Sequence, residues 1–410
     1  MSQEEQRQFL TDFIAHSPTS FHAAARACEL LKQAGYKVED EAQPFDASPG
    51  GHVVVRDGAF IAWYIPPSAK PGACIVGAHT DSPAFKLKPQ PQFTTADGYN
   101  QLAVEVYGGM MPNSWLNREL GVAGRITDRT GKSHLVRTDT VAFLPQLAIH
   151  LDRSAGNKLE LDRQKHLQPI LQEEDILAVV AKEAGVAKQD IVGHDLLTYP
   201  TEGPRVFGED YLASARQDNL LSTAAGLHAL LDLEDSNHVA ILACFDHEEV
   251  GSQSRSGACG PFLESVLNRI IGSETVEVRE QFMAQTTCLS ADVAHAVHPN
   301  YSEKHDPEHH PVFGGGPVLK LNAAQHYSTD SVGQAIFAAA AAEAGQPTQV
   351  FVSNNSSPCG STIAPLTATR LGITTVDIGQ PILSMHSARE VSFLPDFEAT
   401  RAVMAAYLAS

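Results

Sequence analysis

Residues 238–252, HVAILACFDHEEVGS, decide the fold class of this 410-residue chain. The run from His238 to Phe245 is short and apolar, which is typical of a strand that is buried on both faces of a sheet. An aspartate, a histidine and two glutamates follow it directly, at positions 246–249. In open α/β sheets the ligand site lies beyond the carboxyl ends of the strands. The segment therefore predicts a buried strand that ends on a functional site.

Helices and strands alternate on both sides of this strand. The spacing of apolar residues predicts helices at 220–232 and 334–343, with strands at 286–291, 349–353 and 374–378. Nearer the amino end, two helices within 4–35 precede strands at 52–55, 60–64 and 73–78. This alternation predicts an α/β fold with a mainly parallel central sheet flanked by helices.

The pattern changes between about residues 90 and 205. Alternating strands at 102–106, 122–126 and 134–138 run on until the turn-rich stretch 199–209. A chain of this length also exceeds the size at which single cores stop growing. We therefore expect an inserted, mostly β domain over 91–204, which splits a catalytic domain into 1–90 and 205–410.

Charge and hydropathy narrow the possible partners and the compartment. The chain carries 29 basic and 48 acidic residues, so its formal net charge of −19 argues against nucleic acid and membrane surfaces as partners. Residues 1–13 lack the basic start and apolar core of a signal peptide. Apolar stretches such as 335–342 fall far short of the roughly 20 residues that a membrane span needs. A cytoplasmic location is therefore expected.

Five groups of metal-binding type stand at the ends of predicted strands or at the start of a predicted helix. Taken singly, each has an ordinary structural explanation, such as a polar turn, a helix cap or a structural histidine. Together they crowd acidic groups that repel one another unless a cation lies between them. The groups are His79-Thr80-Asp81, Asp218-Asn219, Asp246-His247-Glu248-Glu249, Ser290-Ala291-Asp292 with His295 and His298, and Ser384-Met385-His386-Ser387.

In two of these groups, neighbouring residues suit different roles. In extended chain, positions two apart share a side, so Asp81 is placed to hold and polarise the imidazole of His79. Adjacent glutamates point in different directions, so one of Glu248 and Glu249 can bind metal while the other faces the substrate as a general base. The chain has no His-Glu-x-x-His motif, because no second histidine follows at helical spacing.

The sequence resembles the aspartyl aminopeptidase family of metallopeptidases. The matching segments are GAHTDSP (77–83), QDN (217–219), DHEEVGS (246–252), SADVAHAVHPNY (290–301) and MHS (385–387). They occur in family order and span nearly the whole chain. The resemblance implies an aminopeptidase with two Zn²⁺ ions per subunit, for which Mn²⁺ or Co²⁺ can substitute. It implies that His79, Asp218 and Asp292 hold one ion and that Asp218, Glu249 and His386 hold the other, with Asp218 bridging.

The resemblance also implies a mechanism and a substrate. Glu248 is expected to act as the general base and then to return the proton to the leaving amine, while Asp81 orients His79. The expected substrates are peptides with an amino-terminal Asp or Glu. Lys320 in GGGPVLK (314–320) is the expected cation for the acidic side chain, with Tyr327 and His295 as further contacts.

Assembly is expected as well. His150 matches a histidine that the family places in the active site of a neighbouring subunit, within a tetrahedral dodecamer built from dimers. The inserted domain would then serve dimerisation and act as a lid. One segment departs from the family pattern: YGGMMPNSWLNREL (107–120) carries Asn117 where an aspartate is usual. The departure concerns the contacts of the inserted domain and the fine specificity.

Alternatives remain open at this point. The same metal site suits an aminopeptidase of other or broader selectivity, or a deacylase. A non-catalytic assembly protein on the same fold is a further possibility. A serine or cysteine hydrolase is disfavoured, because the chain has no Gly-x-Ser-x-Gly elbow and none of its cysteines stands in a context that marks a nucleophile.

Overall fold

The computed structural model describes residues 3–410. Met1 and Ser2, which belong to the segment used above to predict a cytoplasmic location, lie outside the described residues. No helix within 3–410 has both the length and the apolarity needed to cross a membrane. The helices are α1 (Gln3–Ala15), α2 (Ser20–Gln33), α3 (Ile176–Ala184), α4 (Gln217–Leu231), α5 (Phe262–Ile271), α6 (Val276–Ala284), α7 (Ser331–Glu343), α8 (Ala364–Leu371) and α9 (Leu394–Ala409).

A nine-stranded sheet forms the centre of the larger part of the molecule, with strand order β1-β2-β3-β14-β4-β15-β19-β17-β18. Five of its eight neighbouring pairs are parallel, so the expected α/β fold with a mainly parallel sheet is confirmed. Its strands are β1 (Lys37–Val38), β2 (Gly50–Arg56), β3 (Ala59–Ile65), β4 (Ala73–His79), β14 (Val239–Phe245), β15 (Thr287–Ala291), β17 (Val318–Leu321), β18 (Gln349–Val352) and β19 (Thr374–Gly379).

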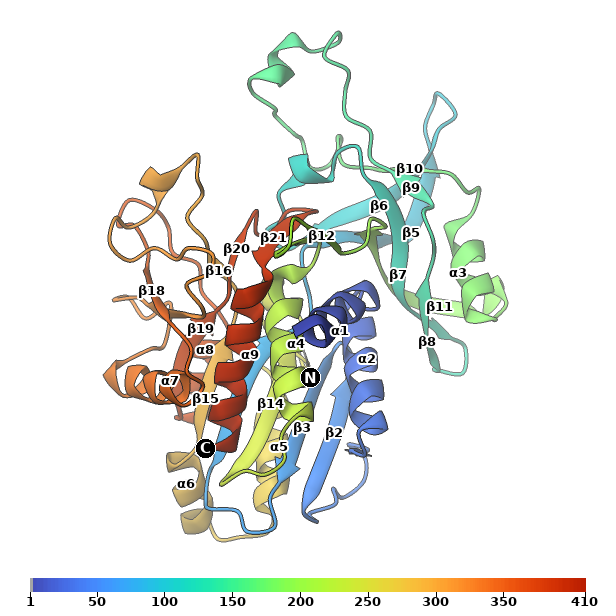
Figure 1. Cartoon of the computed structure of the whole chain (residues 1–410). Coiled ribbons are helices and arrows are strands. Elements are labelled where there is room, and N and C mark those ends of the chain that lie inside the picture. The colour runs from blue at the N-terminus through green and yellow to red at the C-terminus, as the bar shows by residue number, and fades with distance from the viewer. Residues whose placement is uncertain (1–2) are drawn as a thin grey trace.

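Helices cover both faces of this sheet (Figure 1). One face packs against α1, α2, α4, α7 and α9, and the other against α5, α6 and α8. Strand β14 explains why the sequence reads as a continuous apolar run. Its residues Ala240, Leu242 and Cys244 belong to the first core, whereas Ile241 and Phe245 belong to the second. Because successive side chains of a strand point to opposite faces, a strand between two helix layers must be apolar throughout.

A seven-stranded, antiparallel sheet forms a separate body with its own hydrophobic core, at the upper right of Figure 1. Its order is β11-β5-β6-β10-β9-β7-β8, and a further pairing of the first strand, β11, with β7, the last strand but one, closes the sheet on itself. The expected, mostly β insertion is thus present. Its strands are β5 (Ala84–Thr94), β6 (Asn100–Tyr107), β7 (Glu119–Asp128), β8 (Ser133–Arg137), β9 (Ala142–Phe143), β10 (Ile170–Leu171) and β11 (Ile191–Pro200).

A third sheet of five short strands was not expected from the sequence. It has the order β12-β13-β21-β20-β16 and lies between the other two sheets in Figure 1. Its importance for the site is that the chain from β20 to β21 carries His386. Its strands are β12 (Arg205–Phe207), β13 (Tyr211–Ser214), β16 (Ala294–His295), β20 (Pro381–Leu383) and β21 (Glu390–Phe393).

Candidate active site

The predicted metal-binding residues converge at one edge of the nine-stranded sheet. Strands β14, β4 and β15 are neighbours and run parallel, so their carboxyl ends meet there. His79 is the last residue of β4, Glu249 follows β14 and Asp292 follows β15. Asp218 arrives at the start of α4, and His386 on the loop from β20 to β21. Five distant segments of the chain thus supply one cluster.

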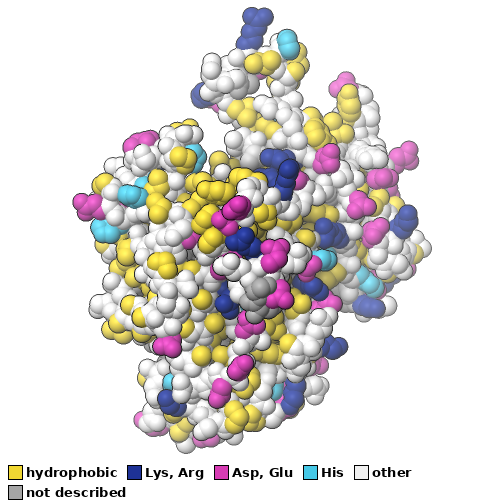
Figure 2. Space-filling view, in the orientation of Figure 1, with side chains coloured by type: hydrophobic (Ala, Val, Ile, Leu, Met, Phe, Trp, Pro, Cys, Tyr) yellow, Lys and Arg dark blue, Asp and Glu magenta, His cyan; other side chains and the backbone are white. Residues whose placement is uncertain are grey.

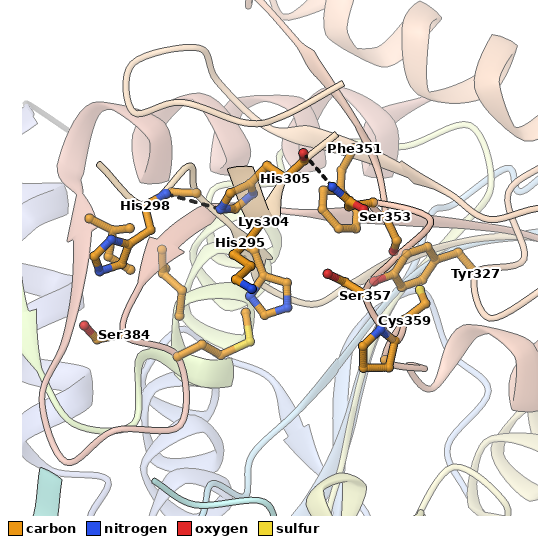
Figure 3. Close-up of a pocket in the computed structure, with 17 residues that line it drawn as sticks. His295, His298, Lys304, His305, Tyr327, Phe351, Ser353, Ser357, Cys359 and Ser384 are labelled. Carbon is orange, nitrogen blue, oxygen red and sulfur yellow. Dashed lines mark hydrogen bonds between the residues drawn. The ribbon is translucent and has the colours of Figure 1, made fainter. Parts of the chain in front are cut away.

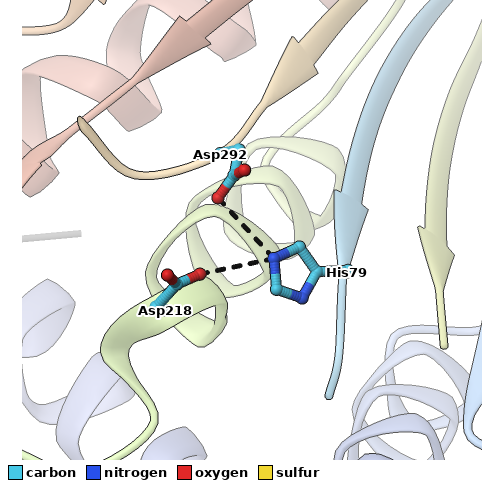
Figure 4. A group of neighbouring side chains, drawn as sticks. All are labelled: His79, Asp218 and Asp292. Atoms are coloured by element: carbon cyan, nitrogen blue, oxygen red, sulfur yellow. Dashed lines mark ion pairs between the residues drawn. The ribbon is translucent and has the colours of Figure 1, made fainter. Parts of the chain in front are cut away.

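The first half of the cluster centres on His79 (Figure 4). Its Nε2 atom lies 3.3 Å from Oδ1 of Asp218 and 3.6 Å from Oδ1 of Asp292. The imidazole is 1% exposed, and the two carboxylates are 5% and 13% exposed. The ligand atoms of these three residues all lie within 4.8 Å of one another, which suits a single metal ion.

The second half of the cluster uses the other oxygen of the same aspartate. Nε2 of His386 lies 3.3 Å from Oδ2 of Asp218 and 3.4 Å from Oε2 of Glu249. These three residues form a second group whose ligand atoms lie within 4.8 Å of one another. Asp218 thus presents one carboxylate oxygen to each half, which is the geometry of a bridging ligand.

The donor atoms of the cluster fit a cation. Asp218 Oδ1 and Glu249 Oε1 are buried and have no hydrogen-bond partner among the described residues, although buried carboxylates normally have one. Burial, together with the charge of Asp218, raises the pKa of Glu249 well above its usual range. Although burial opposes a charge on His386, Asp218 and Glu249 raise its pKa to about 10. The site therefore favours positive charge, and its imidazole and carboxylate donors suit zinc.

Hydrogen bonds fix the orientation of both imidazoles. Nδ1 of His79 lies 3.1 Å from the carbonyl oxygen of Asp81, and Nδ1 of His386 lies 3.1 Å from that of Gly109. A carbonyl can only accept, so each Nδ1 carries a proton, which leaves Nε2 as the ring nitrogen that faces the carboxylates and would bind a metal ion. Both histidines are therefore held in the tautomer that a metal ion requires.

Asp81 and Glu248 lie beside the cluster, as expected of the two candidate catalytic residues. The carboxylate of Asp81 accepts hydrogen bonds from the backbone N–H groups of Glu248 (3.0 Å) and Glu249 (3.1 Å). Oε2 of Glu248 lies 4.0 Å from Nε2 of His79, and the glutamate is 16% exposed. Burial raises the pKa of Glu248 to about 8. A carboxyl group of this basicity, open to the cavity, suits a general base.

Lys320 opens onto the same cavity, which has a volume of about 270 Å³ and is also lined by Asp218, Glu248, Asp292 and His386. The lysine is 3% exposed, so it is not the exposed strand-end residue that an isolated lysine in such a sequence suggests. Its Nζ donates to the carbonyl of Val293 at 2.7 Å and lies 5.4 Å from the ring centre of Tyr327.

No carboxylate of residues 3–410 forms an ion pair with Lys320. Tyr327 and His295 line the cavity beside it, and Tyr327 is buried whereas His295 is exposed. The three expected substrate contacts are therefore brought together with the cluster. The charge of Lys320 acts on the buried carboxylate of Asp377 but is not paired with it, so the lysine is free to pair with a ligand carboxylate in the cavity.

His150 is the one expected site residue that lies elsewhere in the chain's own fold. It is exposed on the segment between β9 and β10 and does not line the catalytic cavity. Asn117, which departs from the family pattern, connects to this segment. Its Oδ1 accepts from the backbone N–H of Gln146 at 3.0 Å, and its Nδ2 donates to Oε1 of Gln146 at 3.3 Å.

Two residues of the site were not predicted from the sequence. Tyr107, the last residue of β6, donates from its hydroxyl to Oδ2 of Asp81 at 2.7 Å. Glu390, which begins β21, accepts from the backbone N–H of Asp218 at 3.1 Å and from that of His386 at 2.8 Å. Glu390 is 1% exposed, and burial, followed by the charge of Asp218, raises its pKa to about 8. No sequence pattern marked either residue, although Glu390 follows the MHS segment closely.

Comparison with known proteins agrees with this geometry. The family model described as "Aminopeptidase I zinc metalloprotease (M18)" matches residues 13–408. A probable M18 family aminopeptidase 2 of Streptomyces avermitilis is 50% identical over 405 residues, which cover 94% of each chain.

Solved structures agree as well. The structure of the mApe1 dodecamer of S. cerevisiae superposes with a TM-score of 0.86 at 28% identity, covering 99% of this chain and 96% of the other. An M18 family aminopeptidase of Thermotoga maritima gives a TM-score of 0.87 at 25% identity, covering 99% and 97%.

The fold and the family match together define a zinc metalloaminopeptidase, a hydrolase that acts on peptide bonds. The chain belongs to the M18 family of zinc metalloproteases.

Proposed function

We propose that the protein removes single amino-terminal residues, preferably Asp or Glu, from peptides, using two zinc ions held at the cluster. His79 and Asp292 would hold one ion, Glu249 and His386 the other, and Asp218 both. The observation that carries the proposal is the bridging geometry of Asp218 beside the unpaired, buried Lys320. When bound, the two ions would polarise the scissile carbonyl and lower the pKa of a water between them.

Side chains of the protein would then transfer the proton and orient the metal ligands. Glu248 accepts the proton of the attacking water and returns it to the leaving amine, a task that its position on the cavity wall, 4.0 Å from Nε2 of His79, suits. Asp81 keeps Glu248 in place through the backbone hydrogen bond that it accepts and keeps His79 in its metal-binding tautomer. The free α-amino group of the substrate is expected to lie by a metal ion or a carboxylate of the site, which would restrict cutting to the chain end.

The preference for acidic residues rests on Lys320, supported by Tyr327 and His295. The global charge of −19 repels an acidic peptide, so selectivity needs a cation inside the cavity. Lys320 makes no ion pair with a carboxylate within residues 3–410, although its charge acts on the buried carboxylate of Asp377, and a substrate carboxylate would supply a direct partner.

The proposal is tested by comparing aspartyl, glutamyl and leucyl anilides with acetylated amino acids, for the wild type and for Lys320→Met. We expect kcat/KM for the aspartyl substrate to fall by roughly 10- to 100-fold in the variant, as for loss of a charged hydrogen bond. Leucyl hydrolysis and zinc content should stay the same. Equal cutting of leucyl and aspartyl anilides by the wild type would refute the acidic preference, and preferential cutting of acetylated amino acids would indicate a deacylase.

We further propose that the enzyme works in the cytoplasm as a homo-oligomer, with a tetrahedral dodecamer of dimers as the expected form. One solved relative, mApe1, is a dodecamer by its description. The segment that carries His150 exposes Leu147, Ile149 and Leu151, each more than half exposed, and it projects at the top of Figure 2, where hydrophobic side chains gather. An apolar projection of this kind suits burial against a second copy, with residues 91–204 as the dimerisation and lid domain and His150 reaching the neighbour's site.

A further inference from the structure

A second cavity adjoins the catalytic one, with a volume of about 290 Å³ (Figure 3). The two cavities share wall residues and so lie next to one another. The shared residues are His295, Tyr327, Phe351, Gly360 and Met385. None of the proposed metal-binding residues lines the second cavity, so it is a separate compartment beside the reacting centre.

The walls of this cavity contain no aspartate or glutamate, in a chain that carries 48 of them. They present Lys304, His298 and His305 on one side and serine hydroxyls such as those of Ser353 and Ser357 on the other, as Figure 3 shows. This composition contrasts with the catalytic cavity, whose walls carry three carboxylates. The second cavity is therefore suited to an anion.

Backbone hydrogen bonds turn two of its imidazoles into donors. The N–H of His298 donates to Nε2 of His305 at 3.2 Å, and the N–H of Asn300 donates to Nδ1 of His298 at 3.2 Å. A nitrogen that accepts carries no proton, so the other nitrogen of each ring is an N–H donor. No hydrogen bond from either of these donors is formed within residues 3–410. Burial, and then His310 and His298, lower the pKa of His305 and outweigh the opposing charge of Glu303, which favours the neutral, donating form.

Lys304 adds a positively charged side chain to the lining of the cavity. It is exposed and makes no ion pair within the described part of the chain, although Glu303 and Asp306 are close in sequence. A lysine, two imidazole donors and several hydroxyls around one cavity are a set that matches a carboxylate, which only accepts hydrogen bonds when ionised.

The position of the scissile bond in an aminopeptidase substrate decides which carboxylate of the peptide reaches this cavity. An aminopeptidase substrate has a single residue before the scissile bond, and under the proposed function its side chain meets Lys320 in the catalytic cavity. Everything else belongs to the leaving peptide. We infer that the second cavity binds a carboxylate of the leaving peptide, either its terminal carboxylate when the peptide is short or an acidic side chain near the cut. This inference rests on the proposed function for the placement of the first residue.

The test uses tripeptides that differ only in their distal carboxylate. Asp-Ala-Ala is compared with its carboxyl-terminal amide and with the amide of Asp-Ala-Glu, and the same three peptides are made with Leu first. The wild type should cut the free acid or the glutamyl amide with a kcat/KM several-fold to about tenfold above that of the neutral amide. Preference for the free acid identifies the chain end as the natural source, and preference for the glutamyl amide identifies a side chain.

Lys304→Gln should remove this preference while leaving hydrolysis of the neutral amide and of aspartyl anilide unchanged. Lys132→Gln, which removes an exposed charge from the turn between β7 and β8, is the matched control and should keep the preference. Equal rates for all three peptides in the wild type, or an equal loss on the anilide in Lys304→Gln, would overturn the inference. The ratio of kcat/KM between peptides that begin with Asp and those that begin with Leu reports separately on Lys320. The proposed acidic preference can therefore fail while the inference about the second cavity is still tested.

Discussion

The residues that face the metal cluster and the residues that hold them in place come from different regions of the molecule. The former lie mainly at the strand ends of the nine-stranded sheet. The latter, Tyr107, Gly109 and Glu390, belong to the other two sheets and the chain next to them, and we refer to these three residues as the collar. Ligand chemistry is thus supplied by one sheet, whereas orientation depends on parts of the fold that pack against it. Substitutions of the residues that face the cluster and substitutions of the collar should therefore impair activity in different ways.

The largest effect should come from Asp218, the bridging residue among those that face the metal cluster. Asp218→Asn removes one negative charge from both halves of the cluster, because its two oxygens serve one half each. We expect zinc content to fall at both sites and peptidase activity to fall by ~10³-fold or more. Metal analysis and anilide hydrolysis on the purified variant check this expectation.

Glu248→Gln is the matched control for this substitution, since it also neutralises a carboxylate of the cavity. It should lower kcat by about 10²- to 10⁴-fold, as for loss of a general base, while zinc remains bound. If both variants kept the same zinc content, the distinction between bridging and base residues would be wrong.

The collar should show a different signature, which begins with Glu390. Its carboxylate accepts the backbone N–H groups of both Asp218 and His386, which belong to different segments of the chain. Glu390→Gln replaces one of the two accepting oxygens by an NH₂ group, which cannot accept a hydrogen bond. One of the two backbone N–H groups therefore loses its acceptor. We expect zinc affinity to fall by about 10- to 100-fold, the range for outer partners of metal ligands. Activity should return when zinc is raised, which separates this variant from Asp218→Asn.

Zinc titration of the chelated protein, followed by activity, measures this shift. Glu343→Gln, an exposed glutamate on α7, serves as the control and should titrate like the wild type. An unchanged titration for Glu390→Gln would mean that the collar does not orient the cluster.

The two regions also differ in how well the sequence predicts them. The apolar run of β14 and the acidic residues after it indicate where the strand ends. The parallel arrangement of β14, β4 and β15 then brings the carboxyl ends of these strands together. All five candidate metal-binding residues could be chosen because such a pattern, or the resemblance, marked each segment. That they meet in one cluster follows from sheet topology, which the alternation of helices and strands predicted in outline.

The collar escaped prediction for physical reasons. Tyr107 ends an ordinary amphipathic strand, and only the docking of the second sheet against the first turns its hydroxyl toward Asp81. Glu390 lies in a four-residue strand of the unexpected third sheet, where a lone glutamate reads as an exposed edge residue. The burial of Lys320 was likewise invisible, since it depends on packing between β17 and neighbouring segments far away in the sequence.

The smallest effect should come from Tyr107, which acts one step further from the cluster. Burial and the charge of Asp81 raise the pKa of this tyrosine well above its usual range, so the hydroxyl stays protonated and donates to Asp81. Tyr107→Phe leaves Asp81 with its two backbone donors and removes one hydrogen bond to a charged group. We expect kcat to fall by about tenfold, with KM for aspartyl anilide and zinc content unchanged.

Tyr199→Phe is the matched control, because Tyr199 is a buried tyrosine of the same sheet whose hydroxyl donates to the carbonyl of Thr138 instead. It should lower the melting temperature without changing kcat. Equal kinetic effects of the two variants would show that the tyrosines serve the stability of the inserted sheet alone. A fall in kcat confined to Tyr107→Phe would instead establish that the inserted sheet acts on the catalytic residues through Asp81, since no other contact of this hydroxyl reaches the cluster within the described residues.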